Sequence, residues 1–210
     1  MRGLAWGIIG AGRFAEHRLL PAFRRTARAG GARLLAVCRR DPDALARWGS
    51  LGVPRLYASP EELVSDPDIA AIFVASPNAD HLSHAALAAR AGKAVLCEKP
   101  MTAGIDEARR LARIVRDTGA PFAVAHCFRQ CGSLAWMKKT IAARRYGRPV
   151  SARAVFTFTA STRHRKWVFR ARDAGGGPFH DVGVHGIDSL RWILGEDPVS
   201  VSAEMRPIPN

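Results

Sequence analysis

Apolar runs of strand length alternate with segments of helical periodicity through the first 125 residues of the chain. Such alternation is typical of βαβ units, in which helices join parallel strands and cover the faces of one sheet. We therefore predict a doubly wound α/β domain with a parallel sheet over residues 1–125. The expected strands are 4–9, 33–38, 70–75, 94–97 and 121–125, and the expected helices are 13–28, 42–49, 60–65, 79–91 and 104–117.

The pattern changes at about residue 126. A helix is expected near 132–145, a long strand rich in β-branched and aromatic residues at 150–159, a helix near 179–194 and a short strand near 199–205. So few strands do not form a self-sufficient sheet domain. We therefore expect residues 126–210 to be the start of an α+β domain that is incomplete in this chain.

Composition limits the classes of partner. Hydrophobic residues make up 48% of the 210 residues, which suffices for a core, and no apolar stretch is long enough to span a bilayer. The formal charge of +14 would ordinarily indicate nucleic-acid binding. The arginines are scattered as doublets, such as Arg24-Arg25 and Arg144-Arg145, rather than clustered with aromatic residues. We therefore expect solvated surface arginine, with no nucleic-acid or membrane partner.

The four cysteines show no Cys-x-x-Cys pairing. Cys38 and Cys97 end apolar strands, which favours reduced, buried thiols in a cytoplasmic protein. Cys127 and Cys131 with His126 would suggest a metal site, but no further ligand pair lies nearby. The sequence therefore predicts no metal.

A glycine-containing turn follows the first expected strand, with Gly10, Gly12 and Ala15 in a Gly-x-Gly-x-x-Ala pattern around Arg13-Phe14. Gly10 permits a tight turn, Gly12 lets the backbone approach a pyrophosphate, and Ala15 allows close packing of helix on strand. The helix N-terminus adds a partial positive charge toward the phosphates. This context predicts a Rossmann-type dinucleotide site, with a structural turn that binds no ligand as the alternative.

The end of the second strand bears on the choice between NADP and NAD. An acid there would bind the ribose 2′-hydroxyl, whereas an arginine would accept a 2′-phosphate. The chain has Arg39-Arg40 before Asp41, and Asp41 is already used as a helix cap. The pattern favours NADP over NAD, although an ordinary solvated turn would also carry such arginines.

Glu98-Lys99-Pro100 directly follows the apolar run 94–97. The carboxyl end of a buried strand is where an open α/β sheet places working groups. Lys99 is therefore a candidate for the proton transfer that accompanies hydride transfer at a hydroxyl or carbonyl group. A surface lysine after a strand is the alternative.

Asp181, His185 and Asp188 form a polar stripe on the expected helix 179–194, within about 60° of one another at about 100° per residue. The opposite side carries the apolar residues Val184, Ile187, Leu190 and Leu194, which we expect to pack on a sheet. The stripe could simply face water. The three glycines at 175–177, which would let the helix end approach a ligand, favour a binding site.

Taken together, these motifs resemble the Gfo/Idh/MocA oxidoreductase family. The resemblance covers the whole chain and rests on the Gly10 turn, Ser76-Pro77-Asn78 with His81, Glu98-Lys99-Pro100, and the segment from Gly175 to Asp188. It implies that Lys99, Asp181 and His185 are a catalytic trio, in which His185 exchanges the substrate proton and Asp181 holds a sugar hydroxyl or orients Lys99. It also implies that Pro77, Asn78, His81 and Glu98 line the nicotinamide side, with Arg129 and Trp167 as wall residues.

Family members are longer than this chain, because their second domain is a large sheet that also forms a homo-oligomer interface. The resemblance therefore implies that the second domain is truncated here. The expected chemistry is reversible hydride transfer between NADP(H), or NAD(H), and a secondary alcohol or carbonyl of a sugar, cyclitol or related polyol. The alternative is a truncated fragment that binds nucleotide without turnover.

Overall fold

The computed structural model describes residues 3–157, 177 and 179–204. Its six strands are all parallel and form one sheet in the order β3-β2-β1-β4-β5-β6. The chain winds outward from β1 in two directions, so the predicted doubly wound sheet is confirmed. The strands are β1 (Ala5–Ile9), β2 (Arg33–Cys38), β3 (Arg55–Tyr57), β4 (Ala71–Val74), β5 (Ala94–Cys97) and β6 (Phe122–Val124).

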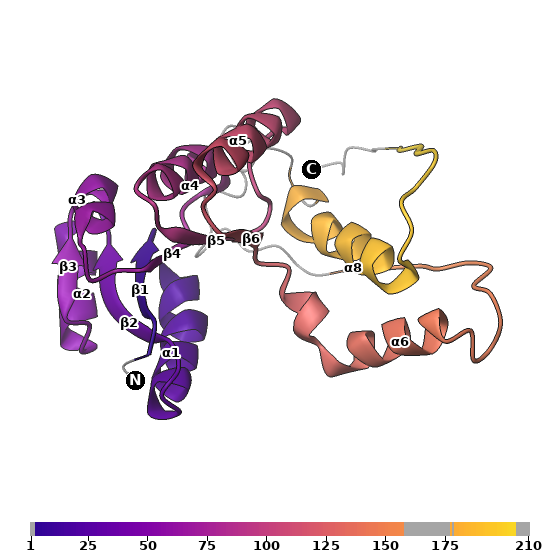
Figure 1. Ribbon diagram of the computed structural model, residues 1–210, viewed down its shortest axis with the longest axis horizontal. Coiled ribbons are helices and arrows are strands. Elements are labelled where there is room, and N and C mark those ends of the chain that lie inside the picture. Colours follow the sequence, from indigo (N-terminus) through magenta and orange to yellow (C-terminus); the bar gives the residue numbers. More distant parts are fainter. Residues whose placement is uncertain (1–2, 158–176, 178, 205–210) are drawn as a thin grey trace, which may run out of the picture. The chain divides into compact units, whose positions relative to one another are not determined.

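Helices cover both faces of this sheet (Figure 1). Ile8 and Ile9 of β1 belong to different apolar clusters, because successive strand residues point to opposite faces. The helical segments of this region are η1 (Ala15–Leu19), α1 (Leu20–Arg28), α2 (Pro42–Ser50), α3 (Pro60–Ser65), η2 (Asn78–Asp80), α4 (His81–Arg90) and α5 (Ile105–Thr118). One cluster includes residues of α3, α4 and α5, and the other includes residues of α1 and α2.

Side-chain caps begin two of these helices, at Asp41, where the sequence predicted a cap, and at Ser59. The Asp41 carboxylate accepts a hydrogen bond of 3.0 Å from the backbone N–H of Ala44, and the Ser59 hydroxyl accepts one of 3.2 Å from Glu62. Each cap satisfies a donor that the first helical turn leaves unpaired. Gly119 ends α5 in the left-handed conformation, with φ of 66°.

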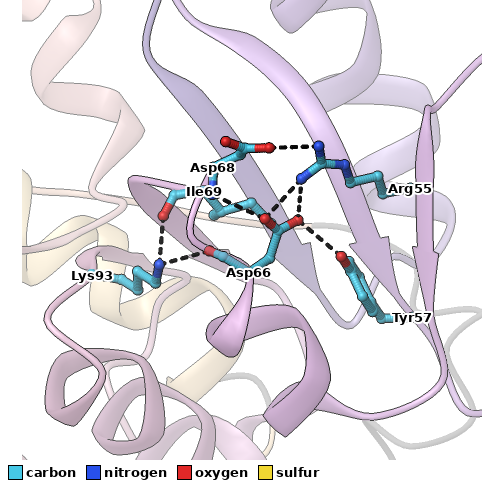
Figure 2. A network of polar contacts seen from close by, with 6 residues as sticks. All are labelled: Arg55, Tyr57, Asp66, Asp68, Ile69 and Lys93. Atoms are coloured by element: carbon cyan, nitrogen blue, oxygen red, sulfur yellow. Dashed lines mark hydrogen bonds and ion pairs between the residues drawn. The ribbon is translucent and has the colours of Figure 1, made fainter.

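The short edge strand β3 was not predicted, and a polar network holds it (Figure 2). Arg55 Nη1 lies 2.7 Å from both carboxylate oxygens of buried Asp66, and the Tyr57 hydroxyl donates to the same carboxylate at 2.8 Å. Lys93 Nζ donates to the backbone oxygens of Asp66 and Ile69 at 2.8 and 2.7 Å. Asp66 therefore ties the edge strand to the segments that precede β4 and β5.

The chain divides into two compact units, the first containing residues up to Ala125 and also Asp181, the second beginning at His126 and also containing Val182 onward. The remaining helical segments are η3 (Cys127–Gln130), α6 (Gly132–Ala142), η5 (Phe179–Gly183) and α8 (Val184–Leu194). In the second unit α6 and α8 lie side by side (Figure 1). No helix in the described part of the chain is long and apolar enough to cross a membrane.

The strands predicted at 150–159 and 199–205 are wrong over the described residues 150–157 and 199–204, which contain no strand. Val150 and Val199 are fully exposed. A strand is stable only when a neighbour accepts and donates its ladder hydrogen bonds. Within the residues that the structure describes, no second strand pairs with either segment, so β-forming composition alone does not produce a strand.

Candidate functional site

The glycine turn after β1 meets two separate demands. Gly10 has φ of +82°, and a Cβ there would lie 2.4 Å from the backbone nitrogen of Ser76, so only glycine fits. A Cβ at Gly12 would meet only Arg39 Nη1 at 3.7 Å and the Gly10 oxygen at 3.9 Å, which are ordinary contacts. Packing within the protein therefore explains Gly10 but not Gly12. A residue without a side chain at Gly12 is what a phosphate needs to approach the backbone.

A helix begins directly after this turn, at Arg13. Ala15 is fully buried in the cluster that contains Ile8, whereas Arg13 and Phe14 are exposed. The small side chain at Ala15 thus allows the close helix packing that the sequence predicted. The backbone N–H groups of the first turn have no partner within the helix, which makes this end suited to an anion.

Arg39 lies across the glycine turn. Its Nη1 donates to the backbone oxygen of Ala11 at 2.9 Å, and the indole N–H of Trp48 donates to the same oxygen at 2.9 Å. The buried Nε of Arg39 has no hydrogen-bond partner among the described residues. Arg40 is exposed. The guanidinium of Arg39 therefore holds the turn and retains a donor, while Arg40 is accessible to a ligand.

The loops after β4 and β5 meet at His81, the first residue of α4. Its Nε2 lies 2.9 Å from the backbone oxygen of Ser76 and its Nδ1 lies 2.8 Å from that of Pro100. His84 Nδ1 contacts the Ser76 hydroxyl at 2.9 Å. The resemblance placed His81 on the nicotinamide side, but its side chain is only 1% exposed. Burial lowers the pKa of His81, and its hydrogen bonds to the two carbonyl oxygens oppose this only in part.

Other residues of these loops have mixed exposure. Pro77 is half-buried and Asn78 is buried. Glu98 is half-buried, and its carboxylate accepts a hydrogen bond of 3.2 Å from the backbone N–H of Lys99. Burial raises the pKa of Glu98, against the opposing influence of Lys99. Pro77 and Asn78 follow β4 and Glu98 follows β5, and all three are candidates for the nicotinamide side of a cofactor.

The structure brings Lys99 and Asp181 together. Lys99 Nζ donates to the backbone oxygen of Asp181 at 2.6 Å and lies 3.2 Å from its Oδ1. Both side chains are largely shielded, at 14% and 10% exposed. Asp181 belongs to η5, a π-helix of five residues. Such short π-helical segments are rare overall and often occur at functional sites. The ammonium group is therefore held in one place, as a proton-transferring group requires.

His185, Arg129 and Asp188 lie in the second compact unit. The His185 ring stacks on Phe128, with ring centroids 4.7 Å apart. Arg129 donates to both oxygens of Asp188, at 3.0 and 2.5 Å, and His126 Nδ1 lies 3.6 Å from the same carboxylate. Arg129 therefore contacts an acid of its own unit. The polar stripe is divided, because Asp181 pairs with Lys99 while Asp188 pairs with Arg129. Trp167 lies outside the described residues.

No cluster of three or more His, Cys, Asp or Glu side chains is placed to hold a metal ion in the described ranges. Cys127 and Cys131 are exposed, whereas Cys38 and Cys97 are buried, as expected for them. The sequence motif Ser76-Pro77-Asn78 included Ser76 but assigned it no role, and the glycine turn rests on this residue. Its partner His84 was not named from the sequence at all.

Comparison with known proteins matches both halves of the chain to family models. Residues 4–126 match an oxidoreductase family with an NAD-binding Rossmann fold, and residues 134–210 match the GFO/IDH/MocA C-terminal domain. The 1,5-anhydro-D-fructose reductase of Ensifer adhaerens is 33% identical over 199 residues, which are 94% of this chain and 59% of that protein.

Solved structures give the same result. The aldose-aldose oxidoreductase from Caulobacter crescentus, solved with glycerol, has a TM-score of 0.81 and 26% identity, covering 94% of this chain and 59% of that one. Levoglucosan dehydrogenase in complex with NADH and levoglucosan has a TM-score of 0.77 and 26% identity, and the match covers 92% of this chain and 54% of that one. The chain thus spans between half and two thirds of the length of the proteins it matches.

Proposed function

The chain belongs to the Gfo/Idh/MocA oxidoreductase family, and on that premise we propose that it is an NAD(P)-dependent oxidoreductase acting on a CH–OH group of a sugar, cyclitol or related polyol. The observation that carries the proposal is the Lys99–Asp181 pair, which lies at the end of β5 in the same compact unit as the glycine turn. Relatives named for 1,5-anhydro-D-fructose and levoglucosan support this substrate class.

When bound, the nicotinamide would supply the hydride acceptor or donor. Lys99 Nζ would give a proton to the carbonyl oxygen during reduction and remove it from the hydroxyl during oxidation. Asp181 accepts from Lys99 and so fixes where that proton is exchanged. We keep His185 as the second proton-exchanging group on the strength of the resemblance, and its stacking on Phe128 orients the ring.

The backbone of residues 10–15 would hold the pyrophosphate, and Pro77, Asn78 and Glu98 would line the nicotinamide. NADP is the proposed preference, with Arg39 and Arg40 on the 2′-phosphate. Because Arg39 also holds Ala11 within the turn, Arg40 gives the cleaner test.

Arg40→Ala should weaken NADPH about tenfold and leave NADH nearly unchanged, because it removes a charge-assisted contact to the 2′-phosphate alone. Calorimetric titration of both cofactors measures this. Arg144→Ala is the control for a change in overall charge. An equal loss for the two cofactors, or no loss, would reject Arg40 as the phosphate ligand.

Lys99→Met should lower kcat about 10²–10⁴-fold, because the general acid and base is gone, while cofactor Kd stays within about twofold. Absorbance of the reduced nicotinamide reports turnover, with 1,5-anhydro-D-fructose and levoglucosan as first substrates. Lys139→Met, at an exposed position, is the matched control. A variant that keeps most of its turnover contradicts the assignment. Cofactor binding without turnover on a broad polyol panel would favour the nucleotide-binding alternative.

A further inference from the structure

We propose that Trp48 of α2 is a positioning residue of the cofactor turn, because its buried indole N–H holds the backbone oxygen of Ala11 within the glycine turn. The inference rests on the proposed function, because it concerns how the turn is prepared for a pyrophosphate. Trp48 belongs to none of the sequence motifs of the site. At 2% exposed it presents no surface to a ligand, so its effect on cofactor binding passes through the turn.

The hydrogen bond of Trp48 is more than a requirement of a tryptophan in this core. Trp48 lies in the apolar cluster that contains Ile8, and a buried indole N–H usually finds an acceptor. Trp6 packs against the same cluster, yet its buried Nε1 has no hydrogen-bond partner among the described residues. The cluster therefore tolerates an unpaired indole N–H. The acceptor of Trp48 is 37 positions away in the turn, which indicates a contact specific to this position.

The peptide between Ala11 and Gly12 is held at both of its polar groups. The oxygen accepts from Trp48 at 2.9 Å, and the N–H on the other side of the peptide plane donates to the Gly10 oxygen at 2.7 Å. Rotating this peptide would therefore break contacts on both sides. The oxygen of Gly12 accepts from the N–H of Glu16 at 3.0 Å, so the orientation of the turn sets the start of the helix that would face a phosphate.

Two donors share the Ala11 oxygen, and they differ in what else they can do. Arg39 Nη1 donates at 2.9 Å, as Trp48 does, and a carbonyl oxygen has two lone pairs to accept both. Arg39 is only partly buried, and its charge makes it a proposed ligand of a 2′-phosphate. The indole N–H is shielded and uncharged, so a phosphate does not compete for it. Trp48 is therefore the donor that stays on Ala11 when Arg39 engages a ligand.

The neighbouring residue of α2 contacts the same helix start. Arg47 donates to both carboxylate oxygens of Glu16, at 3.0 and 2.5 Å. The Arg47 side chain is 62% exposed, so this pair contributes less than the shielded Trp48 contact. Successive residues of α2 thus hold the turn before the helix and a residue of its first turn. We infer that α2 supports the phosphate-binding end of the helix, with Trp48 as its main contact.

Two tryptophan variants test this role. Trp48→Phe keeps an aromatic ring in the cluster and removes the N–H donor. Trp6→Phe is the matched control, because it takes the same group from the same cluster without breaking a hydrogen bond among the described residues. Calorimetric titration with ADP, NADH and NADPH, which all carry the pyrophosphate, measures binding. Hydrogen exchange of peptides covering 8–19 reports on the turn without any ligand.

We expect Trp48→Phe to speed exchange at 8–19 and to weaken all three ligands about 2- to 10-fold, as for the loss of one hydrogen bond, with NADPH affected at least as much as NADH. A turn that is correctly oriented only part of the time lowers apparent affinity by that fraction. The cofactor KM should rise with little change in kcat, because Lys99 is untouched. Trp6→Phe should change each affinity by less than about twofold. Equal losses in both variants, or unchanged ADP affinity in Trp48→Phe, would overturn the proposal.

A second substitution covers the case in which Trp48→Phe folds poorly. Replacing Trp48 with 3-benzothienylalanine keeps the shape of the indole and puts sulfur in place of the N–H, so packing is preserved. The same loss of ADP affinity is expected, and wild-type affinity would overturn the role of the N–H. The proposed function can fail separately. Weaker ADP binding in the variant, with no polyol turnover by the wild type, would remove the oxidoreductase assignment and leave the role of Trp48 in place.

Discussion

The two halves of this molecule use similar apolar residues with different results. Up to Ala125, every strand pairs with a parallel neighbour and both faces of the sheet are covered. After Ala125, Ile193 is the one buried apolar side chain among the described residues, while Val150, Val155 and Phe156 are exposed. The comparison shows that burial requires a partner element, because strand-forming residues acquire structure only where a ladder and a covering helix already exist.

The largest expected difference between the halves is in thiol reactivity. Burial raises the pKa of Cys38 to about 11 and that of Cys97 to about 12, whereas the Ser133 hydroxyl and nearby backbone N–H groups lower the pKa of exposed Cys131. The thiolate is the reactive form. Iodoacetamide at pH 8 should therefore label the exposed Cys127 and Cys131 at least about 10³-fold faster than the buried Cys38 and Cys97. Peptide mass spectrometry checks this, with full labelling in denaturant as control. Rapid labelling of Cys97 would contradict the described core.

Replacing a glycine by alanine in each half should give the next largest difference, in the free energy of unfolding. Gly10→Ala should destabilise the protein by about 2–4 kcal/mol, because the Cβ would overlap the Ser76 backbone at a left-handed φ. At Gly186 in α8 the nearest atoms are side-chain carbons of Ala154 and Phe156 at 3.3 Å, in a segment without strand pairing. Gly186→Ala should therefore shift the free energy of unfolding by less than about 1 kcal/mol. Urea denaturation measures both. Equal losses would mean that residues 154–156 are held as firmly as the sheet.

Two buried aspartates provide a smaller contrast. Asp66→Asn should cost about 2 kcal/mol, less than a fully buried pair because Arg55 is partly exposed. Asp68→Asn is the matched control, since the exposed Asp68 contacts the same arginine and should cost less than about 0.5 kcal/mol. Asp188→Asn should lower the stability of the second unit alone and leave the thermal unfolding transition of the first unit in place. A loss of that transition would mean that the halves unfold as one.

Acid should destabilise the protein through the hydrogen bonds and ion pair of Asp66. Burial by itself would raise the pKa of Asp66, but hydrogen bonds from Arg55, the Asp68 backbone and Tyr57 outweigh it, and the pKa lies below its usual value. A depressed folded pKa contributes stability that is present above the unfolded pKa of about 3.9 and lost as pH falls through the folded value. Asp66→Asn should flatten the decline in stability below about pH 4. An unchanged pH profile in the variant would remove Asp66 as the source.

Local signals in the sequence determined much of the first half. Alternation and apolar run length predicted β1, β2 and β5 to within one residue, and cap chemistry predicted the start of α2. The glycine turn was predicted from its context, a strand followed directly by a helix, and the structure has this context. Its role in binding a cofactor stays a prediction. These features depend on neighbours within a few positions, so their physical causes are contained in short stretches of chain.

Tertiary structure decided what depends on distant partners. Lys99 and Asp181 are 82 positions apart, so no local pattern in the sequence shows that they form a pair. The polar stripe of helix 179–194 had no visible partners in sequence, and the expected apolar face is wrong at Ile187, which is exposed while Asp188 is buried against Arg129. His81 is the clearest case. A pattern of residue types suggests that a histidine is near a site, but only the tertiary structure places its ring between the backbone oxygens of Ser76 and Pro100, because contacts with the main chain leave no periodicity in the sequence.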